Sequence, residues 1–234
     1  ENAENWQAQV AQYCQQLGVV LVTEKITLMH SGEGLEAEAR NARYAVFERL
    51  LEPNGLLFLG HHADDQVETV LYRLMRGSGA KGLSGMPNKR VLGKGYVVRP
   101  FLDCAKSALE NEAQLRNLVW IEDESNQNID FDRNFIRSKF LPILKNRFSH
   151  IIKVISRSSS HLAEAQHLLD NLAQIDLKSS LKSYNYKHKL NVKTLDKLSN
   201  ARAKNALRFW LELNNQMMPS KDLLDELLRQ VLTA

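Results

Sequence analysis

The fold is decided by the stretch Gly60-His61-His62-Ala63-Asp64-Asp65-Gln66-Val67-Glu68-Thr69. It follows directly on Leu56-Leu57-Phe58-Leu59, an all-apolar run expected of a strand buried on both faces. Helical periodicity continues from about residue 64 to residue 76, so the sequence predicts a strand, a polar turn and a helix. In open α/β sheets ligands bind beyond the carboxyl ends of strands, which makes these polar residues a candidate ligand site.

Apolar patterns on both sides of this stretch extend the alternation of helix and strand. Helices are predicted at residues 6–17, 35–51 and 105–117, and strands at residues 19–23, 96–98 and 118–121. Strands separated by helices of this length indicate βαβ units, hence an α/β fold with an open, mostly parallel sheet and flanking helices. Beyond residue 134 the strand signals fade, and helices are predicted at residues 150–175, 201–213 and 221–232.

These patterns predict three parts of the chain. We expect an α/β domain at residues 1–147, a long linker helix at residues 148–176 and a small helical domain at residues 177–234. A chain of 234 residues with 44% hydrophobic and 25% charged residues is ordinary for a globular protein, which excludes a disordered chain. The two cysteines, Cys14 and Cys104, exclude a disulfide scaffold and indicate a reducing compartment. No apolar run approaches the roughly 20 residues needed to span a bilayer.

The net charge of +4 conceals blocks of opposite sign. Residues 1–72 carry 11 acidic and 4 basic residues, and residues 103–132 carry 8 acidic and 2 basic residues. By contrast, residues 73–102 carry 7 basic and no acidic residues, and residues 133–234 carry 18 basic and 8 acidic residues. Such asymmetry fits a polyanion partner, and it fits a solvated basic face equally well.

The acidic residues after His62 can carry chemistry. If Asp64 starts the helix and caps its free N–H groups, Asp65, Glu68 and Thr69 lie on one helix face. Two carboxylates on one face can hold Mg²⁺ or an ammonium group. For a lone Asp-Asp pair, a capped, solvated helix start with two loop histidines is the favoured explanation. The two histidines ahead of the pair and its place at a strand end strengthen the case for a functional site. A zinc site is disfavoured because no cysteine or His-x₃-His pair accompanies the cluster.

A second acidic stretch, Glu122-Asp123-Glu124-Ser125-Asn126, follows the strand predicted at residues 118–121. Shortly after it, Arg133 and Arg137 are spaced one helical turn apart. Guanidinium forks suit phosphate recognition, but acids and arginines this close can equally form a surface ion-pair network. Both interpretations stay open.

Two further segments give weaker signals. Arg76-Gly77-Ser78-Gly79-Ala80-Lys81-Gly82 can cradle a phosphate, although a lone glycine-rich loop is weak evidence. On the helix predicted at residues 35–51, the face opposite the apolar stripe carries Glu36, Arg40 and Arg43. Solvated salt bridges are the default explanation of such a face.

Taken together and in this order, these segments resemble the tRNA(Ile)-lysidine synthetases. That family has an EARxxRY-like helix, followed by HHxDDxxET, RGSGxxGL, WxEDxSN and RNxxR. The corresponding segments of this chain are residues 38–44, 61–69, 76–83, 120–126 and 133–137. The match covers about the first 147 residues. HHxDDxxET alone is shared with other ATP pyrophosphatases that act on tRNA, so the specificity lies in the whole set.

The chain departs from the family pattern in one respect. These enzymes also carry a strand followed by SGGxDS, the loop that holds the ATP phosphates, and this motif does not occur in the 234 residues. The resemblance therefore predicts an internal portion of such an enzyme, beginning just after that loop and ending before a further C-terminal domain.

The resemblance implies an ATP-pyrophosphatase-like, nucleotide-binding catalytic domain, a small substrate-binding domain and a carbon–nitrogen ligase. Such an enzyme uses ATP, as its Mg²⁺ complex, to adenylate O2 of the wobble cytidine in the CAU anticodon of an isoleucine tRNA. The ε-amine of lysine then attacks C2 and expels AMP, which gives lysidine. The implied partners are tRNA, lysine and ATP. No prosthetic group and no membrane are implied, the expected location is cytoplasmic, and a homodimer is a further expectation.

The family motifs also imply roles for single residues. The lysine ammonium must lose a proton before it attacks, and carboxylates can bind it and assist that loss. We therefore expect Asp65 and Glu68 to bind lysine and to act in catalysis. Residues expected near the nucleotide are His61, His62 and Asp64. Candidates for contacts to ATP phosphate or the tRNA backbone are Arg133, Asn134, Arg137 and Arg76. Asp123 and Asn126 are expected to shape the rim of the site, and no residue is assigned to a metal.

Several alternatives stay open. The basic residues 133–234 and the missing phosphate loop also suit a tRNA-binding module that is inactive in this truncated form, or a related ATP-dependent tRNA-modifying enzyme. A tRNA sulfur transferase is disfavoured because such enzymes use paired cysteines or an iron–sulfur cluster, whereas Cys14 and Cys104 lie 90 positions apart. A purely structural helical protein is disfavoured by the polar cluster at residues 61–69.

Overall fold

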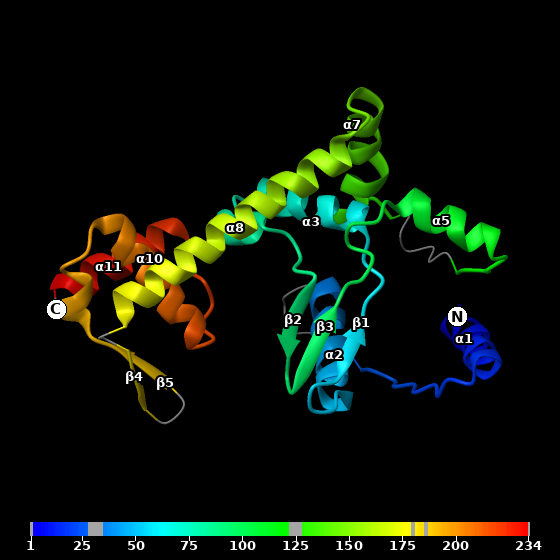
Figure 1. The fold of residues 1–234 in the computed structure, drawn as a ribbon, viewed down its shortest axis with the longest axis horizontal. Coiled ribbons are helices and arrows are strands. Elements are labelled where there is room, and N and C mark those ends of the chain that lie inside the picture. Colours follow the sequence, from blue (N-terminus) through cyan, green and yellow to red (C-terminus); the bar gives the residue numbers. More distant parts are fainter. Residues whose placement is uncertain (1, 28–34, 122–127, 179–180, 185–186, 234) are drawn as a thin grey trace. The chain divides into compact units, whose positions relative to one another are not determined.

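The computed structural model describes residues 2–27, 35–121, 128–178, 181–184 and 187–233. The chain divides into two compact units, each described by itself below. The first unit comprises Glu1–Tyr72 and Met86–Ser156, and the second comprises Arg73–Gly85 and Arg157–Ala234. Figure 1 shows the helices and strands of both units.

Within the described residues, the first unit has a three-stranded sheet of order β1-β3-β2. Strand β1 (Leu56–Phe58) is parallel to β3 (Gly95–Val98), and β2 (Lys89–Leu92) is antiparallel to β3. The helices of this unit are α1 (Asn2–Leu17), α2 (Leu35–Leu50), α3 (Ala63–Met75), α5 (Lys106–Leu115), α6 (Asp132–Phe135) and α7 (Leu141–Arg147). A π-helical turn, η2 (Ile136–Phe140), joins α6 to α7.

Helix α2 lies against one face of this sheet (Figure 1). Val97, in the middle of β3, is fully buried. The approach is close, because a Cβ on Gly95 would lie 3.0 Å from Cδ2 of Leu51 and 2.5 Å from the carbonyl oxygen of Gly55. Since side chains alternate along a strand, Arg99 follows Gly95 and Val97 onto the face that α2 covers.

The sheet differs from the prediction at residues 19–23 and 118–121, which form no strand. Their apolar side chains are largely exposed, for example Val20 at 86% and Val119 at 71%. A β-branched, apolar run becomes a strand when a neighbouring strand pairs with it and its side chains are covered. Neither condition is met there within the described residues, so the prediction of these two strands is wrong.

The sheet is also mixed, where a mostly parallel one is predicted, because β2 pairs antiparallel with β3. The sequence feature that indicates β2 is the pair Gly93-Lys94, which forms a tight hairpin between β2 and β3. Gly93 has φ +53°, as such a turn requires. Strand β1 is not buried on both faces, since Leu56 is 50% and Phe58 62% exposed. The predicted burial of β1 is therefore wrong for the face that α2 does not cover.

The predicted helices are confirmed, with ends shifted by no more than four residues. Four-residue and seven-residue helices such as α6 and α7 are missed because they are too short to show periodicity. The α/β fold class is confirmed as well.

The core of the first unit joins the helices that carry the candidate residues. Val67 and Leu71 of α3 pack against Ile136 of η2 and Leu141 of α7. Burying a side chain of this size contributes about 1.5–3 kcal/mol. The segment before β2 is tied to α3 by Gln66, whose Nε2 donates to the carbonyl oxygen of Met86 at 2.9 Å while its Oε1 accepts from the Met86 N–H at 2.7 Å. These contacts fix α3, η2 and α7 relative to one another.

The second unit has a separate helical core. Long helix α8 (Ile151–Leu177) leads to α9 (Val192–Leu195), α10 (Asn200–Leu213) and α11 (Lys221–Thr233). Its core residues include Leu177, Leu195, Leu207 and Leu224. Within the described residues a two-stranded hairpin, β4 (Leu181–Tyr184) and β5 (Lys187–Leu190), precedes α9 and was not predicted. No helix in the described ranges is both long and apolar enough to cross a membrane.

Candidate functional site

Helix α3 begins at Ala63, soon after the carboxyl end of β1, and His62 caps it. Nδ1 of His62 accepts a hydrogen bond from the backbone N–H of Asp65 at 3.3 Å, and Oδ2 of Asp65 accepts one from the backbone N–H of His62 at 3.0 Å. This is the reciprocal pattern of a capping box, with histidine in the place of serine or threonine. The prediction that Asp64 caps this helix is therefore wrong.

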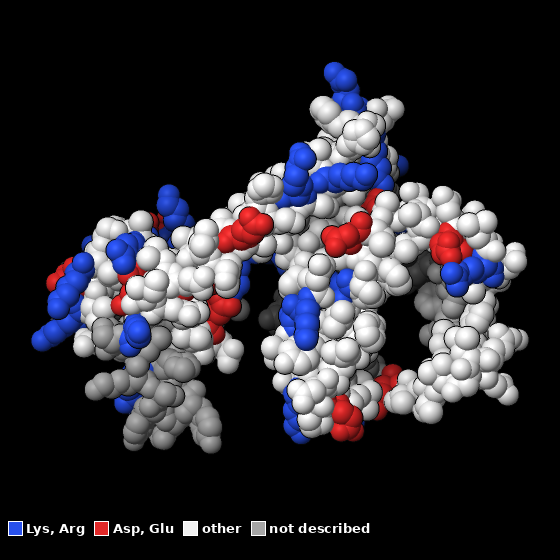
Figure 2. Space-filling model, viewed as in Figure 1, with Lys and Arg blue, Asp and Glu red and all other residues white. Residues whose placement is uncertain are grey.

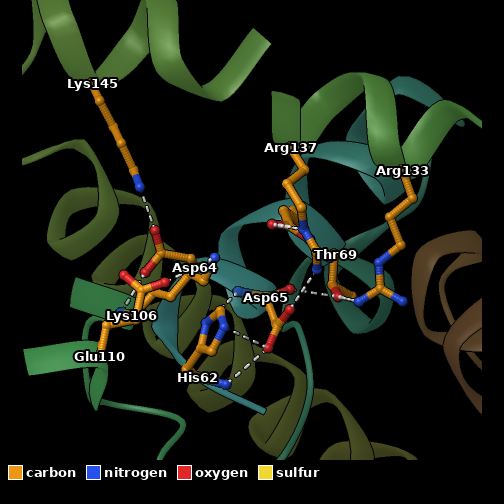
Figure 3. Close-up of polar contacts among 10 residues, drawn as sticks. His62, Asp64, Asp65, Thr69, Lys106, Glu110, Arg133, Arg137 and Lys145 are labelled. Carbon is orange, nitrogen blue, oxygen red and sulfur yellow. Dashed lines mark hydrogen bonds and ion pairs between the residues drawn. The ribbon is translucent and has the colours of Figure 1, made fainter. Parts of the chain in front are cut away.

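Asp64 instead links three helices (Figure 3). The residue is 5% exposed, and its Oδ2 accepts a hydrogen bond from the backbone N–H of Lys106, the first residue of α5, at 2.9 Å. Its Oδ1 pairs with the ammonium group of Lys145 on α7. Burial raises the pKa of Asp64, but the hydrogen bonds from Lys145 and Lys106 outweigh burial and hold that pKa below its ordinary value.

We expect Asp64→Asn to lower the free energy of unfolding by about 1–2 kcal/mol near pH 7, because charge-assisted hydrogen bonds are lost. Since the folded-state pKa lies below the unfolded one, this stabilisation is present above about pH 4 and disappears as the pH falls through the folded-state pKa. The gap between wild type and variant should therefore shrink in acid, as urea unfolding at several pH values would measure. Asp103→Asn, at an exposed position, is the control. A gap independent of pH would contradict the clamping role of Asp64.

Asp65 and Glu68 share one guanidinium group, that of Arg137 on η2. Nε and Nη2 of Arg137 donate to Oε1 and Oε2 of Glu68 at 2.8 and 2.7 Å, and Nη2 also donates to Oδ1 of Asp65 at 2.8 Å. The side chains of Asp65 and Glu68 are 12% and 2% exposed, against 36% for Arg137. The hydrogen bond to Glu68 raises the pKa of Arg137 in spite of burial. Two carboxylates thus face one guanidinium in a half-buried place.

Arg133 lies one turn before Arg137 and reaches the same helix face. Its Nη2 donates to Oγ1 of Thr69 at 3.3 Å, and Oγ1 of Thr69 donates to the carbonyl oxygen of Asp65 at 2.8 Å. The predicted common face of Asp65, Glu68 and Thr69 is thus confirmed by the two arginines that meet it. Nε of Arg133 is buried without a hydrogen-bond partner among the described residues. Buried donors are normally satisfied, so this atom is suited to meet a bound anion.

His61 follows β1 at the same edge of the sheet. Burial lowers the pKa of His61, and the charges of Arg99 and Arg133 lower it further, although Asp65 raises it. The imidazole is therefore neutral near pH 7. Its Nδ1 is buried and has no hydrogen-bond partner in the part of the chain that is described.

The remaining predicted residues are placed as follows. Nδ2 of Asn134 donates to the carbonyl oxygen of Asn128 at 2.9 Å. Arg76 belongs to the second unit, just past α3. Asp123 and Asn126 lie outside the described residues.

The glycine-rich segment after Arg76 has a structural explanation. Gly77, at φ +71°, ends α3 with hydrogen bonds from Gly77 N–H to the Leu74 carbonyl and from Ser78 N–H to the Arg73 carbonyl, both 3.0 Å. This is a Schellman motif. A Cβ on Gly82, in the short helix α4 (Ala80–Leu83), would lie 2.5 Å from Cβ of Ser78. Chain reversal and close packing thus account for both glycines.

Basic residues accumulate near the carboxylates. Residues 133–147 include five basic and no acidic residues. On the face drawn in Figure 2, Lys and Arg side chains gather around α7. Within the described ranges, no group of three or more His, Cys, Asp or Glu side chains is arranged to hold a metal ion.

A parallel strand pair with polar and charged residues at its carboxyl edge is the arrangement of nucleotide-binding α/β proteins. The family model described as PP-loop domain matches residues 1–144, more than half of the chain, so the chain belongs to the PP-loop family. A second family model, described as TilS substrate binding domain, matches residues 190–234.

Curated relatives narrow the family further. A tRNA(Ile)-lysidine synthase of Coxiella burnetii is 41% identical over 233 residues, which are 99% of this chain and 51% of the relative. Those of Pseudomonas fluorescens and Actinobacillus pleuropneumoniae are 44% and 39% identical, over 90% and 100% of this chain and 48% and 55% of the relatives. The chain spans about half the length of the curated relatives it matches. Within the PP-loop family, the similarity to tRNA(Ile)-lysidine synthases that the motifs predict is thus confirmed.

Proposed function

We propose that this chain carries the lysine-binding part of an ATP-dependent ligase. The ligase joins lysine to the wobble cytidine of the isoleucine tRNA with a CAU anticodon, through an adenylated tRNA, and forms lysidine. One observation carries the proposal, namely the pair Asp65 and Glu68 held against Arg137 near the carboxyl edge of β1. The names of the relatives, all tRNA(Ile)-lysidine synthases, supply the substrates.

The chemistry of lysine fits this pair of carboxylates. An ammonium group is attracted by two carboxylates that share a single guanidinium, and the low exposure of Glu68 strengthens that attraction. Before the amine attacks C2 of the adenylated cytidine it must lose a proton, which a carboxylate within hydrogen-bond reach can accept. We assign binding of the ammonium and acceptance of its proton to Asp65 and Glu68. AMP then leaves as the new C–N bond forms.

The PP-loop match implies that ATP is used. The neutral imidazole of His61 and the unsatisfied Nε of Arg133 support a nucleotide or another anion beside this site. We propose that Mg²⁺ arrives with the phosphates of ATP, because within the described residues no group of three or more His, Cys, Asp or Glu side chains is arranged to hold a metal ion. We propose that His62, which caps α3, and Asp64, which ties α3 to α5, hold this helix in place. The expectation that both residues lie near the nucleotide stays a prediction.

Two observations support tRNA as the partner. They are the run of basic residues at 133–147 and the match of residues 190–234 to a substrate-binding domain. We propose that Arg133 contacts a phosphate, whereas Arg137 is paired with the carboxylates of Asp65 and Glu68. Phosphate contacts from Asn134 and Arg76 stay predictions. The expected role of Asp123 and Asn126 in shaping the rim of the site stays a prediction as well. The two free cysteines suit the proposed cytoplasmic location. A homodimer stays a prediction.

The experiment incubates the protein, with its complete sequence, with tRNA, ATP and labelled lysine. We expect one lysine per tRNA on the fragment that contains the anticodon, together with one AMP and one pyrophosphate. If no lysine is incorporated while tRNA still binds in a salt-sensitive way, the alternative of a tRNA-binding module is correct instead.

A further inference from the structure

Two guanidinium groups lie over one aromatic ring on the sheet side of α2. Cζ of Arg40, also on α2, is 5.0 Å from the centroid of the Tyr44 ring, and Cζ of Arg90, on β2, is 4.9 Å from it. Each contact is a cation–π interaction. Because like charges repel, two cations gathered on one ring favour a negative charge close to them.

Arg99 adds a third guanidinium and is almost fully buried, at 3% exposure. Its Nη1 donates to the carbonyl oxygen of Pro87 at 2.8 Å, but its Nε is buried without a hydrogen-bond partner among the described residues. Burial lowers the pKa of Arg99, Tyr44 raises it, and the charges of Arg90 and Arg40 lower it again. A buried cation with an unused donor is costly, and a bound oxyanion would offset that cost.

The topology of the sheet places this cluster where ligands bind. Since β1 and β3 are parallel, Arg99 after β3 and His61 after β1 lie at the same carboxyl edge. Arg90 pairs across the sheet with Val97, and Arg99 is two residues beyond Val97, so both arginines lie on the face toward α2 and Tyr44. The positive charges of Arg90 and Arg99 and the unsatisfied Nε of Arg99 therefore lie together at the carboxyl edge of the sheet.

We propose that Arg90, Arg99 and Tyr44 form a phosphate-binding site at this edge of the sheet. Guanidinium forks offer paired N–H groups to phosphate oxygens, and the phenol hydroxyl can donate one more hydrogen bond. A nucleoside triphosphate and an RNA backbone both present such oxygens. That choice of ligands rests on the proposed function, whereas anion binding at the cluster does not.

The test compares Arg90→Gln with a matched control, Lys89→Gln. Lys89 is the neighbour of Arg90 on β2, but strand alternation puts it on the other face, where its Nζ lies 4.0 Å from the centroid of the Tyr96 ring. Each variant removes one positive charge from the same strand. Calorimetry with inorganic tripolyphosphate probes the nucleotide arm, and the salt dependence of tRNA binding probes the RNA arm, both on the protein with its complete sequence.

We expect Arg90→Gln, unlike Lys89→Gln, to weaken the binding of either tripolyphosphate or tRNA. At least about 10-fold weaker tripolyphosphate binding assigns the site to the nucleotide. A decrease of about 0.7–0.9 in the slope of log affinity against log salt assigns it to the RNA backbone, because one phosphate contact is lost. Equal effects of the two variants, or no effect in either arm, would overturn the proposal.

A second variant guards against misfolding. If Arg90→Gln does not fold, Arg90→Lys keeps the charge but loses the planar fork. For this variant, weaker tripolyphosphate binding assigns the site to the nucleotide, and weaker tRNA binding with an unchanged salt slope assigns it to the RNA backbone. No loss in either arm would overturn the proposal. Neither arm measures lysine transfer. Binding of an anion at this cluster can therefore be established or overturned even if the proposed ligase activity is not found.

Discussion

Glu68→Gln should reduce kcat/KM for lysine by about 100-fold or more, while the affinity for tRNA changes less than about threefold. Glu68 is 2% exposed, so its charge acts in a place where water screens it little. Losing a charge-assisted hydrogen bond there costs on the order of 3 kcal/mol, which corresponds to about 100-fold in rate. Initial rates at varied lysine, with ATP and tRNA saturating, measure the effect.

The control for this prediction is Glu112→Gln, which removes the charge of an exposed ion pair with Arg116 on α5. Glu68→Gln also loosens Arg137, so thermal unfolding of both variants should accompany the kinetics. A parallel fall of tRNA affinity and lysine use would show that Glu68 supports the fold, and the assignment to lysine would then be wrong.

Arg137→Gln should lower the KM for lysine several-fold and lower kcat by about 10–100-fold. Without the guanidinium, two neighbouring carboxylates hold the ammonium more strongly, which raises the pKa of the bound amine and makes its deprotonation harder. The deficit in kcat should therefore narrow as the pH rises from 7 to 9. The free energy of unfolding should fall by about 2 kcal/mol, since Glu68 and Asp65 lose their partner.

The control for Arg137 is Lys139→Gln, an exposed cation on the same π-helical turn. Steady-state kinetics at several pH values and urea unfolding provide both readouts. A raised KM with unchanged kcat would mean that Arg137 itself helps to hold lysine, contrary to its proposed role as the partner of the two carboxylates.

The common face of Asp65, Glu68 and Thr69 follows from the helical period alone, and the site was predictable to that extent. Their partners were not, because Arg137 lies 69 residues beyond Glu68 and no local pattern joins them. Asp64 shows the same limit. The resemblance to the synthetases implies a place near the nucleotide, whereas the carboxylate of Asp64 is paired with Lys145, 81 residues later.

Elements were predictable where the pattern was long. The helical periodicity over α8 and α10 predicts both helices correctly. The runs at residues 19–23 and 118–121 have the composition of strands but form none. Strand propensity depends on pairing and packing with neighbouring strands, which the composition of a short run does not determine. Arg40 was expected on a solvated face with salt bridges, yet its guanidinium lies over the ring of Tyr44, as does that of Arg90. That contact depends on how α2 meets β2, which no local sequence pattern specifies.

The measurement that tests the central claim most directly is competition between lysine and norleucine in the lysine-transfer assay. Norleucine has the same backbone and the same four-carbon stem, but it lacks the ε-ammonium group of lysine. If Asp65 and Glu68 bind that ammonium, norleucine should inhibit with an affinity at least about 100-fold weaker than the affinity for lysine. Inhibition by norleucine at the same concentrations as lysine would contradict the assignment of these carboxylates.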